Sequence, residues 1–137
     1  MGACELITIG RREMAKVLVI DDEQNFRTIV EMVLRSHGYE VLLADNGTTG
    51  LSMYRQEHPT VVVLDLKMPG MDGIAVFQEM RRENPKQPVI VLSGDSSPET
   101  EREVRALGVS EFIVKGRSVH VLTDTLKRLL ASLSHAA

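Results

Sequence analysis

The feature that most constrains the fold is an alternation of short apolar runs with longer segments of helical periodicity. The runs, rich in β-branched and other apolar side chains, are Lys16–Ile20, Glu40–Leu43, Val61–Leu64, Pro88–Leu92 and Glu111–Val114. The segments between and after them carry apolar residues at the spacing of one helix face. Such alternation is typical of a parallel sheet with helices on both faces. The third run is apolar at every residue, as expected of a strand covered on both sides.

Five helices are predicted from this periodicity and from residues that favour helix ends. They cover residues from about Phe26 to His37, Asn46–Glu57, Asp72 to about Glu83, Ser97 to about Leu107, and Ser118–Leu133. Gly38 stands where a helix commonly ends, and Ser97 followed by Pro98 is a favourable helix start. The fourth helix has few apolar residues, so we expect it to lie shallowly on the surface.

Length and composition indicate one domain. The 137 residues, 43% of them hydrophobic and 26% charged, suffice for a core without disulfides or metals. We assign residues 15–137 to the domain and residues 1–14 to a poorly ordered prefix, because Met14 would be a natural start. Apolar runs fall short of the ~20 residues that a membrane span needs. With no signal-peptide pattern and only Cys4 as a thiol, we expect a cytoplasmic protein that does not enter membranes.

Charge and aromatic content argue against binding of nucleic acid by this chain. The net charge is −3, and the basic residues are scattered rather than gathered as a nucleic-acid footprint requires. Aromatic residues make up 4% of the chain and Trp is absent, which disfavours base stacking. Any role in transcription would therefore act through another polypeptide.

Polar side chains stand where four of the predicted strands end, namely Asp21, Asp22, Asp65, Ser93 and Lys115. In open parallel sheets the ligand site lies beyond the carboxyl ends of the strands. Oxygen ligands without a Cys or His cluster favour a hard cation such as Mg²⁺, which would also relieve repulsion among three carboxylates. A carboxylate can attack phosphorus to form an aspartyl phosphate, while the metal and a lysine neutralise phosphoryl charge.

Four segments in order carry a family resemblance: Val17–Glu23, Leu64–Gly73, Leu92–Gly94 and Phe112–Lys115. Together they resemble the receiver domain of two-component response regulators, including the chemotaxis receivers, over about Lys16 to Leu133. The resemblance implies a flavodoxin-like, doubly wound five-stranded parallel sheet of order 2-1-3-4-5. It also implies that Asp65 accepts a phosphoryl group from a histidine kinase or histidine phosphotransfer protein.

The resemblance implies roles for the metal and phosphate ligands as well. Asp22 and Asp65 would hold Mg²⁺ with the backbone carbonyl of Lys67, and Asp21 would contribute directly or through water. Lys115 would pair with the phosphate. The chain would act as a signalling domain rather than an enzyme, one that supports its own phosphorylation and autodephosphorylation.

Two further pairs of residues take their roles from the same resemblance. Ser93 and Phe112 would form a switch, the hydroxyl moving to the phosphate while the ring turns inward. The signal would then be read by a protein target or effector domain on the face built from the fourth helix, fifth strand and fifth helix, which also allows a phosphorylation-dependent dimer. Lys67 and Asp95, of opposite charge, would bridge the mouth of the site and slow hydrolysis, although a solvated surface role explains them equally well.

One residue departs from the family pattern. Receivers usually have a proline joined by a cis peptide bond after the lysine, whereas Gly116 follows Lys115 here. A cis bond to a non-proline residue costs ~3 kcal/mol, so the usual loop geometry is not expected. The flexibility of glycine would let the lysine reach the site with less preorganisation.

Alternative interpretations remain. Asp22 could be only a helix cap, Lys115 a surface lysine, and Ser93 part of ordinary loop chemistry. A phosphohydrolase of the haloacid dehalogenase type also uses Mg²⁺ and a strand-end Asp, but Lys67 stands where its general acid belongs. A nucleotide-binding protein would need a glycine-rich turn where Asp21 stands. Within the receiver interpretation, the chain is either free-standing or the receiver portion of a larger regulator with an effector domain.

Overall fold

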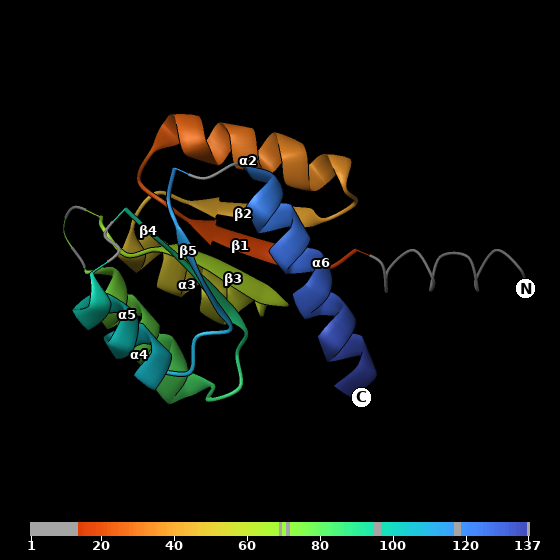
Figure 1. The fold of residues 1–137 in the computed structure, drawn as a ribbon. Coiled ribbons are helices and arrows are strands. Elements are labelled where there is room, and N and C mark those ends of the chain that lie inside the picture. The colour runs from red at the N-terminus through yellow and green to blue at the C-terminus, as the bar shows by residue number, and fades with distance from the viewer. Residues whose placement is uncertain (1–13, 69, 71, 95–96, 117–118, 137) are drawn as a thin grey trace, which may run out of the picture.

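The computed structural model describes residues 14–68, 70, 72–94, 97–116 and 119–136, and the structural statements below concern these residues. The chain forms a five-stranded sheet in which every neighbouring pair of strands is parallel. The strands are β1 (Lys16–Ile20), β2 (Glu40–Ala44), β3 (Val61–Asp65), β4 (Val89–Ser93) and β5 (Glu111–Val114). Their order is β2-β1-β3-β4-β5, which confirms the fold class expected from the sequence (Figure 1).

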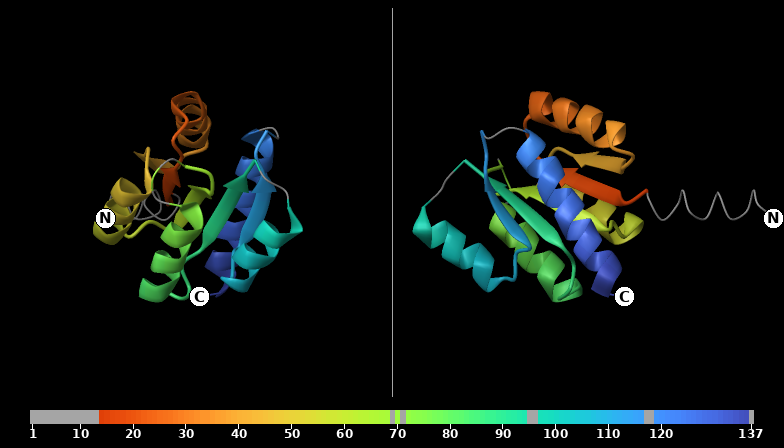
Figure 2. Two further views of the ribbon diagram at one scale, coloured as in Figure 1. Left: turned by 90° about the vertical axis from the view of Figure 1, so that its left-hand side faces the viewer. Right: turned by 45° about the vertical axis from the view of Figure 1, so that its right-hand side comes forward.

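Helices cover both faces of this sheet (Figures 1 and 2). They are α2 (Gln24–Ser36), α3 (Gly47–Glu57), α4 (Gly73–Glu83), α5 (Pro98–Ala106) and α6 (Val119–Ala136). The apolar sides of α2 and α6 pack with alternate strand residues in one core cluster, and those of α3, α4 and α5 pack with the remaining strand residues in the other. Alternation along each strand therefore divides the core into two layers.

The helix ends follow the residues that predicted them. Gly38 has a φ of 89°, and the amides of Gly38 and Tyr39 donate to the carbonyls of Arg35 and Leu34, which completes a Schellman end to α2. Ser97 caps α5 by accepting from the amide of Thr100, with Pro98 as the first helical residue. These local signals were sufficient to place both ends within one residue.

Several details differ from the sequence-based prediction. Asp65 and Ser93 are the last residues of β3 and β4 rather than the residues after them, because Asp65 pairs with Leu92 in the ladder. Ile29, which recurs with the apolar residues of α2, is 46% exposed, because it lies at the edge of the stripe that packs on the sheet. Residues 1–13 and Ser118 lie outside the described part of the chain, so the prefix and domain assignments stay predictions.

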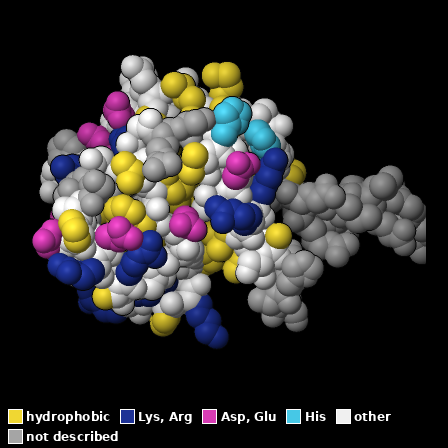
Figure 3. Space-filling model, in the orientation of Figure 1, with side chains coloured by type: hydrophobic (Ala, Val, Ile, Leu, Met, Phe, Trp, Pro, Cys, Tyr) yellow, Lys and Arg dark blue, Asp and Glu magenta, His cyan; other side chains and the backbone are white. Residues whose placement is uncertain are grey.

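Two surface properties bear on function. On the face in Figure 3, Lys and Arg side chains are interspersed with Asp and Glu rather than gathered in one basic patch. No helix among the described residues is long and apolar enough to cross a membrane.

Candidate functional site

Two buried carboxylates meet at the carboxyl ends of the central strands. β1 and β3 are adjacent, so Asp21 after β1 and Asp65 at the end of β3 lie side by side. Asp21 is fully buried and Asp65 is 2% exposed, whereas Asp22 is exposed. The Glu23 amide donates to Asp21 Oδ1 at 2.8 Å, and the Lys67 amide donates to Asp65 Oδ1 at 3.2 Å. These backbone donors fix the orientation of both carboxylates.

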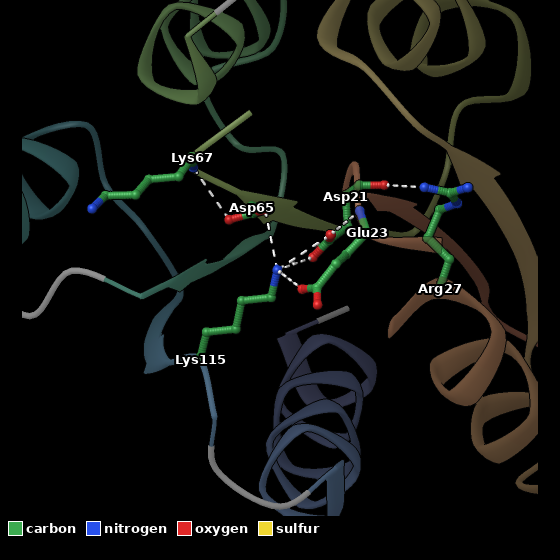
Figure 4. A network of polar contacts seen from close by, with 6 residues as sticks. All are labelled: Asp21, Glu23, Arg27, Asp65, Lys67 and Lys115. Carbon is green, nitrogen blue, oxygen red and sulfur yellow. Dashed lines mark hydrogen bonds and ion pairs between the residues drawn. The ribbon is translucent and has the colours of Figure 1, made fainter. Parts of the chain in front are cut away.

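Lys115 reaches the carboxylates from the end of the edge strand β5. Its amide donates to the carbonyl of Ser93 at 2.7 Å, which holds the start of the loop against β4. Its ammonium Nζ lies 3.0 Å from Asp21 Oδ2, 3.3 Å from Asp65 Oδ2 and 2.9 Å from Glu23 Oε1 (Figure 4). One cation thus links strands that stand apart in the sheet.

Burial and mutual repulsion dominate the electrostatics of the carboxylates. Burial, followed by the negative charge of Asp21, raises the pKa of Asp65 to about 6, against the charge of Lys115 and the hydrogen bond from the Lys67 amide. Burial also raises the pKa of Asp21, although the Glu23 amide and Lys115 oppose the shift. The protein groups at the site therefore leave part of its negative charge uncompensated.

The pKa of Lys115 shifts in the direction that keeps the ammonium charged. Burial by itself lowers this pKa. Hydrogen bonds to Glu23 and Asp21 and the charges of Asp65 and Asp21 outweigh burial, so the net pKa is raised above its ordinary value. The lysine therefore stays cationic throughout the physiological pH range. A permanent cation beside a carboxylate nucleophile is suited to binding the oxygens of a phosphoryl group.

The donor set fits a hard divalent cation. One carboxylate oxygen from each of Asp21, Asp22 and Asp65 lies within 4.8 Å of the others. Asp21 Oδ2 is buried and accepts no hydrogen bond of good geometry from the described residues, so its only close partner is the charge of Lys115. Three oxygen ligands, one of them exposed to solvent, match the preference of Mg²⁺ for carboxylates and retained waters.

The remaining predicted site residues are placed less completely. Ser93 is fully buried at the end of β4, and Phe112 is partly buried in β5 against the core cluster of α3, α4 and α5. The side chain of Lys67 is exposed and points away from Asp65 (Figure 4). Asp95 lies outside the described residues, so the proposed bridge between Lys67 and Asp95 stays a prediction.

Sequence reasoning missed three contacts from the start of α2. Glu23 pairs with Lys115, Arg27 Nη1 donates to the carbonyl of Asp21 at 2.8 Å, and the Phe26 ring centroid lies 5.0 Å from Lys115 Nζ. Glu23 belongs to the acidic run after β1, which was a signal for the first contact. The other two depend on how α2 is rotated about its axis, which the sequence pattern leaves open.

The loop after Lys115 differs from the family pattern, as expected from Gly116. No peptide bond among the described residues is cis, and Gly116 has a φ of 103°, in the left-handed region that favours glycine. Lys115 nevertheless reaches Asp65. The ammonium thus contacts Asp65 although the peptide bond after Lys115 is not cis.

Comparison with known proteins places this geometry in a family. The model of the family described as "Response regulator receiver domain" matches residues 17–127. A curated relative, the probable transcriptional regulator ycf27 of Porphyridium aerugineum, is 39% identical over 89% of this chain and 50% of its own length. The chain spans half or less of the length of the curated relatives that it matches first.

Solved structures agree with the family match. The chemotaxis protein CheY4 of Vibrio cholerae is 32% identical, with a TM-score of 0.79 over 84% of this chain and 98% of that one. The response regulator TrrA of Thermotoga maritima, solved in complex with Mg²⁺ and BeF, is 31% identical, with a TM-score of 0.77. That match covers 85% of this chain and 99% of TrrA.

Proposed function

The chain belongs to the response regulator receiver domain family, and we propose that Asp65 is the residue on which it accepts a phosphoryl group. The observation that carries this proposal is the contact of a buried strand-end carboxylate with Lys115, at 3.3 Å, beside the oxygen cluster of Asp21 and Asp22. A purely structural carboxylate at this depth would gain little from repelling two others.

The chemistry requires a carboxylate oxygen of Asp65 to form a bond to phosphorus as the bond from phosphorus to the donor breaks. The donor, an imidazole nitrogen or an acyl phosphate oxygen, leaves with the bonding electron pair. Lys115 would hold the phosphoryl oxygens, and the Lys67 amide would keep Asp65 oriented for in-line attack. Like other receivers, the domain would serve as signal acceptor and support its own phosphorylation and autodephosphorylation.

We propose Mg²⁺ as the cofactor, held by Asp21, Asp22 and Asp65 with the backbone carbonyl of Lys67. The support is the buried oxygen of Asp21 without a hydrogen bond and the exposed side of the cluster at Asp22. Mg²⁺ would neutralise negative charge on the transferring phosphoryl group.

A direct test follows the stoichiometry of phosphoryl uptake. With acetyl phosphate or phosphoramidate and Mg²⁺, the wild type is expected to take up one phosphoryl group, and Asp65→Asn none, with its fold intact by circular dichroism. Asp124→Asn, an exposed carboxylate on α6, is the matched control. Wild-type labelling of Asp65→Asn would show that another residue is the acceptor, and release of many phosphates per chain would indicate a phosphohydrolase.

We propose that the donor is a histidine kinase or histidine phosphotransfer protein and that the output face consists of α5, β5 and α6. A groove of about 220 Å³ runs along β5 and α6, lined in part by Phe112, Val121 and Arg128. Hydrophobic side chains reach the surface on this side of the molecule (Figure 3). An effector domain, a separate target or a second phosphorylated copy would occupy the face. The cytoplasmic location stays a prediction.

A further inference from the structure

The turn after Lys115 does little to direct its side chain. Gly116 adopts a φ of 103°, and a Cβ at this position would meet nothing within 4 Å, so no side chain at Gly116 itself steadies the turn. Lys115 follows an edge strand, which has a neighbour on one side only. A lysine side chain gives up about 2 kcal/mol of rotamer entropy when it becomes fully ordered. Contacts from elsewhere in the fold must therefore hold the ammonium at Asp65.

Besides the carboxylate of Asp21 at 3.0 Å, those contacts come from the start of α2. The ring centroid of Phe26 lies 5.0 Å from Lys115 Nζ, and Glu23 Oε1 lies 2.9 Å from it. Glu23 is the N-cap residue of α2 and Phe26 lies in its first turn, so the same helix end supplies both contacts. Phe26 also lines a small apolar pocket with Gly116 and Leu122, which places the ring close to the turn.

This first turn is itself anchored to the acidic loop. Arg27, the next residue after Phe26, donates from Nη1 to the carbonyl of Asp21 at 2.8 Å, and its amide donates to the carbonyl of Glu23 at 3.0 Å. The position of the aromatic ring is thus tied to the residue that follows β1, Asp21. The ring can therefore keep the lysine ammonium at a constant distance from the carboxylates.

The two partners hold the lysine in different ways. The side chain of Glu23 is 63% exposed. Its carboxylate offsets the charge of the ammonium and also occupies one of the ammonium's N–H donors. An aromatic face attracts the same cation without accepting a conventional hydrogen bond, so the donors stay available for phosphoryl oxygens. With Lys115 only 19% exposed, solvent screens this attraction incompletely.

We propose that Phe26 is a positioning residue for phosphoryl transfer: its ring holds the Lys115 ammonium over Asp65 where the Gly116 turn does not. This inference rests on the proposed roles of Asp65 and Lys115. A cation–π contact of this kind contributes about 0.5–1 kcal/mol, which corresponds to a roughly two- to fivefold change in rate or affinity.

The test is a double-mutant cycle on Phe26 and Lys115. Phe26→Leu keeps an apolar side chain but removes the aromatic face, Phe26→Tyr retains it, and Lys115→Met removes the cation. We expect Phe26→Leu to slow phosphorylation by acetyl phosphate, and to weaken fluoroberyllate binding, by about two- to fivefold. Mg²⁺ affinity and the Phe26→Tyr rate should stay close to wild type. In the Lys115→Met background, Phe26→Leu should have no further effect.

The outcomes separate this inference from the proposed function. If wild type fails to take up a phosphoryl group, the proposed role of Asp65 is refuted. If wild type is phosphorylated and Phe26→Leu is phosphorylated at the same rate, only the proposed role of Phe26 is refuted. Independent, multiplying effects of Phe26→Leu and Lys115→Met would likewise overturn it, because the ring would then act through general stability. Phe26→Met replaces Phe26→Leu should the latter not fold.

Discussion

At the scale of single residues, the site is a local concentration of like charge that the fold tolerates. Asp21 and Asp65 are buried together, and Lys115 is the cation whose ammonium contacts both carboxylates among the residues that the structure describes. Burial and the neighbouring charge raise the pKa of Asp65 to about 6. The folded protein therefore binds a proton at Asp65 more tightly than the unfolded chain, whose pKa stays near 3.8.

This shift predicts a pH-dependent stability of the metal-free protein. Because the pKa of Asp65 is raised in the folded state, the contribution of protonated Asp65 to the free energy of unfolding is fully present below the unfolded pKa of 3.8. This contribution is lost as pH rises through about 6. In chelator at pH 7.5, Asp65→Asn should thus raise the free energy of unfolding by up to about 3 kcal/mol, and with it the melting temperature. Near pH 4.5 the gain should be much smaller. Millimolar Mg²⁺ should stabilise wild type but hardly affect the variant.

Thermal unfolding of wild type, Asp65→Asn and the control Asp124→Asn at both pH values measures this difference. A gain for Asp65→Asn that is equal at pH 4.5 and 7.5 would contradict the assignment of the shift to this carboxyl. A wild-type melting temperature unchanged by Mg²⁺ at matched ionic strength would count against the metal site.

The strand-end residues could be predicted from sequence, whereas their supporting contacts could not. Asp21, Asp65 and Lys115 each follow or end an apolar run, and parallel topology brings such positions to one edge. Phe26 and Arg27 reach the site only through the rotation of α2 and the rotamers of long side chains. A hydrophobic stripe predicts the rotation of a helix only coarsely: Ile29 is apolar and was expected to face the core, yet it is exposed.

At the scale of elements, α5 is anchored just after its C-terminal end by Arg81 of α4. Of its nine residues, all within the described chain, only Val104 is buried, which confirms the shallow packing expected from its composition. Arg81 of α4 donates to the carbonyls of Leu107 and Gly108 just after α5, at 2.6 and 2.9 Å. It also donates to the carbonyls of Asn84 and Gln87.

Arg81→Ala is therefore expected to loosen α5 from its C-terminal end. Several hydrogen bonds from one charged group, each worth about 1.5–3 kcal/mol, would be lost, although water would replace part of them. We expect a loss of at least about 2 kcal/mol in urea unfolding and faster amide exchange in α5 than in α3. Arg82→Ala is the matched control, because Arg82 is exposed and forms a surface ion pair with Glu79. Equal destabilisation by both variants would refute a special role for Arg81.

Element order was predictable because periodicity and helix-end residues agree along the chain. Boundaries were less so where a polar functional residue continues a strand. Asp65 and Ser93 are polar, so the apolar pattern ends before them, yet ladder pairing includes both. Polar site residues at the strand ends therefore make those ends hard to predict from the hydrophobic pattern.

At the scale of the whole molecule, Lys115 connects the centre of the sheet to its edge. β1 and β3 are central and carry Asp21 and Asp65, whereas Lys115 follows the edge strand β5. A phosphoryl group on Asp65 would accept new hydrogen bonds from Lys115. Any movement of Lys115 toward it would pull on β5, which has a neighbouring strand on one side only. The central strands, buried between two helical layers, offer far less freedom to move.

We therefore predict that phosphorylation alters α5, β5 and α6 more than the body of α2. α5 has one buried residue, and Phe112 is only partly buried, so both have room to rearrange at modest cost. α2 is anchored to the acidic loop through Arg27, and Val30 and Leu34 in its later turns are fully buried in the core cluster that α2 shares with α6. Amide chemical shifts with and without fluoroberyllate and Mg²⁺ measure the response. Asp65→Asn, treated identically, should stay unchanged, whereas wild-type shifts concentrated in α2 beyond its first turn would contradict this route.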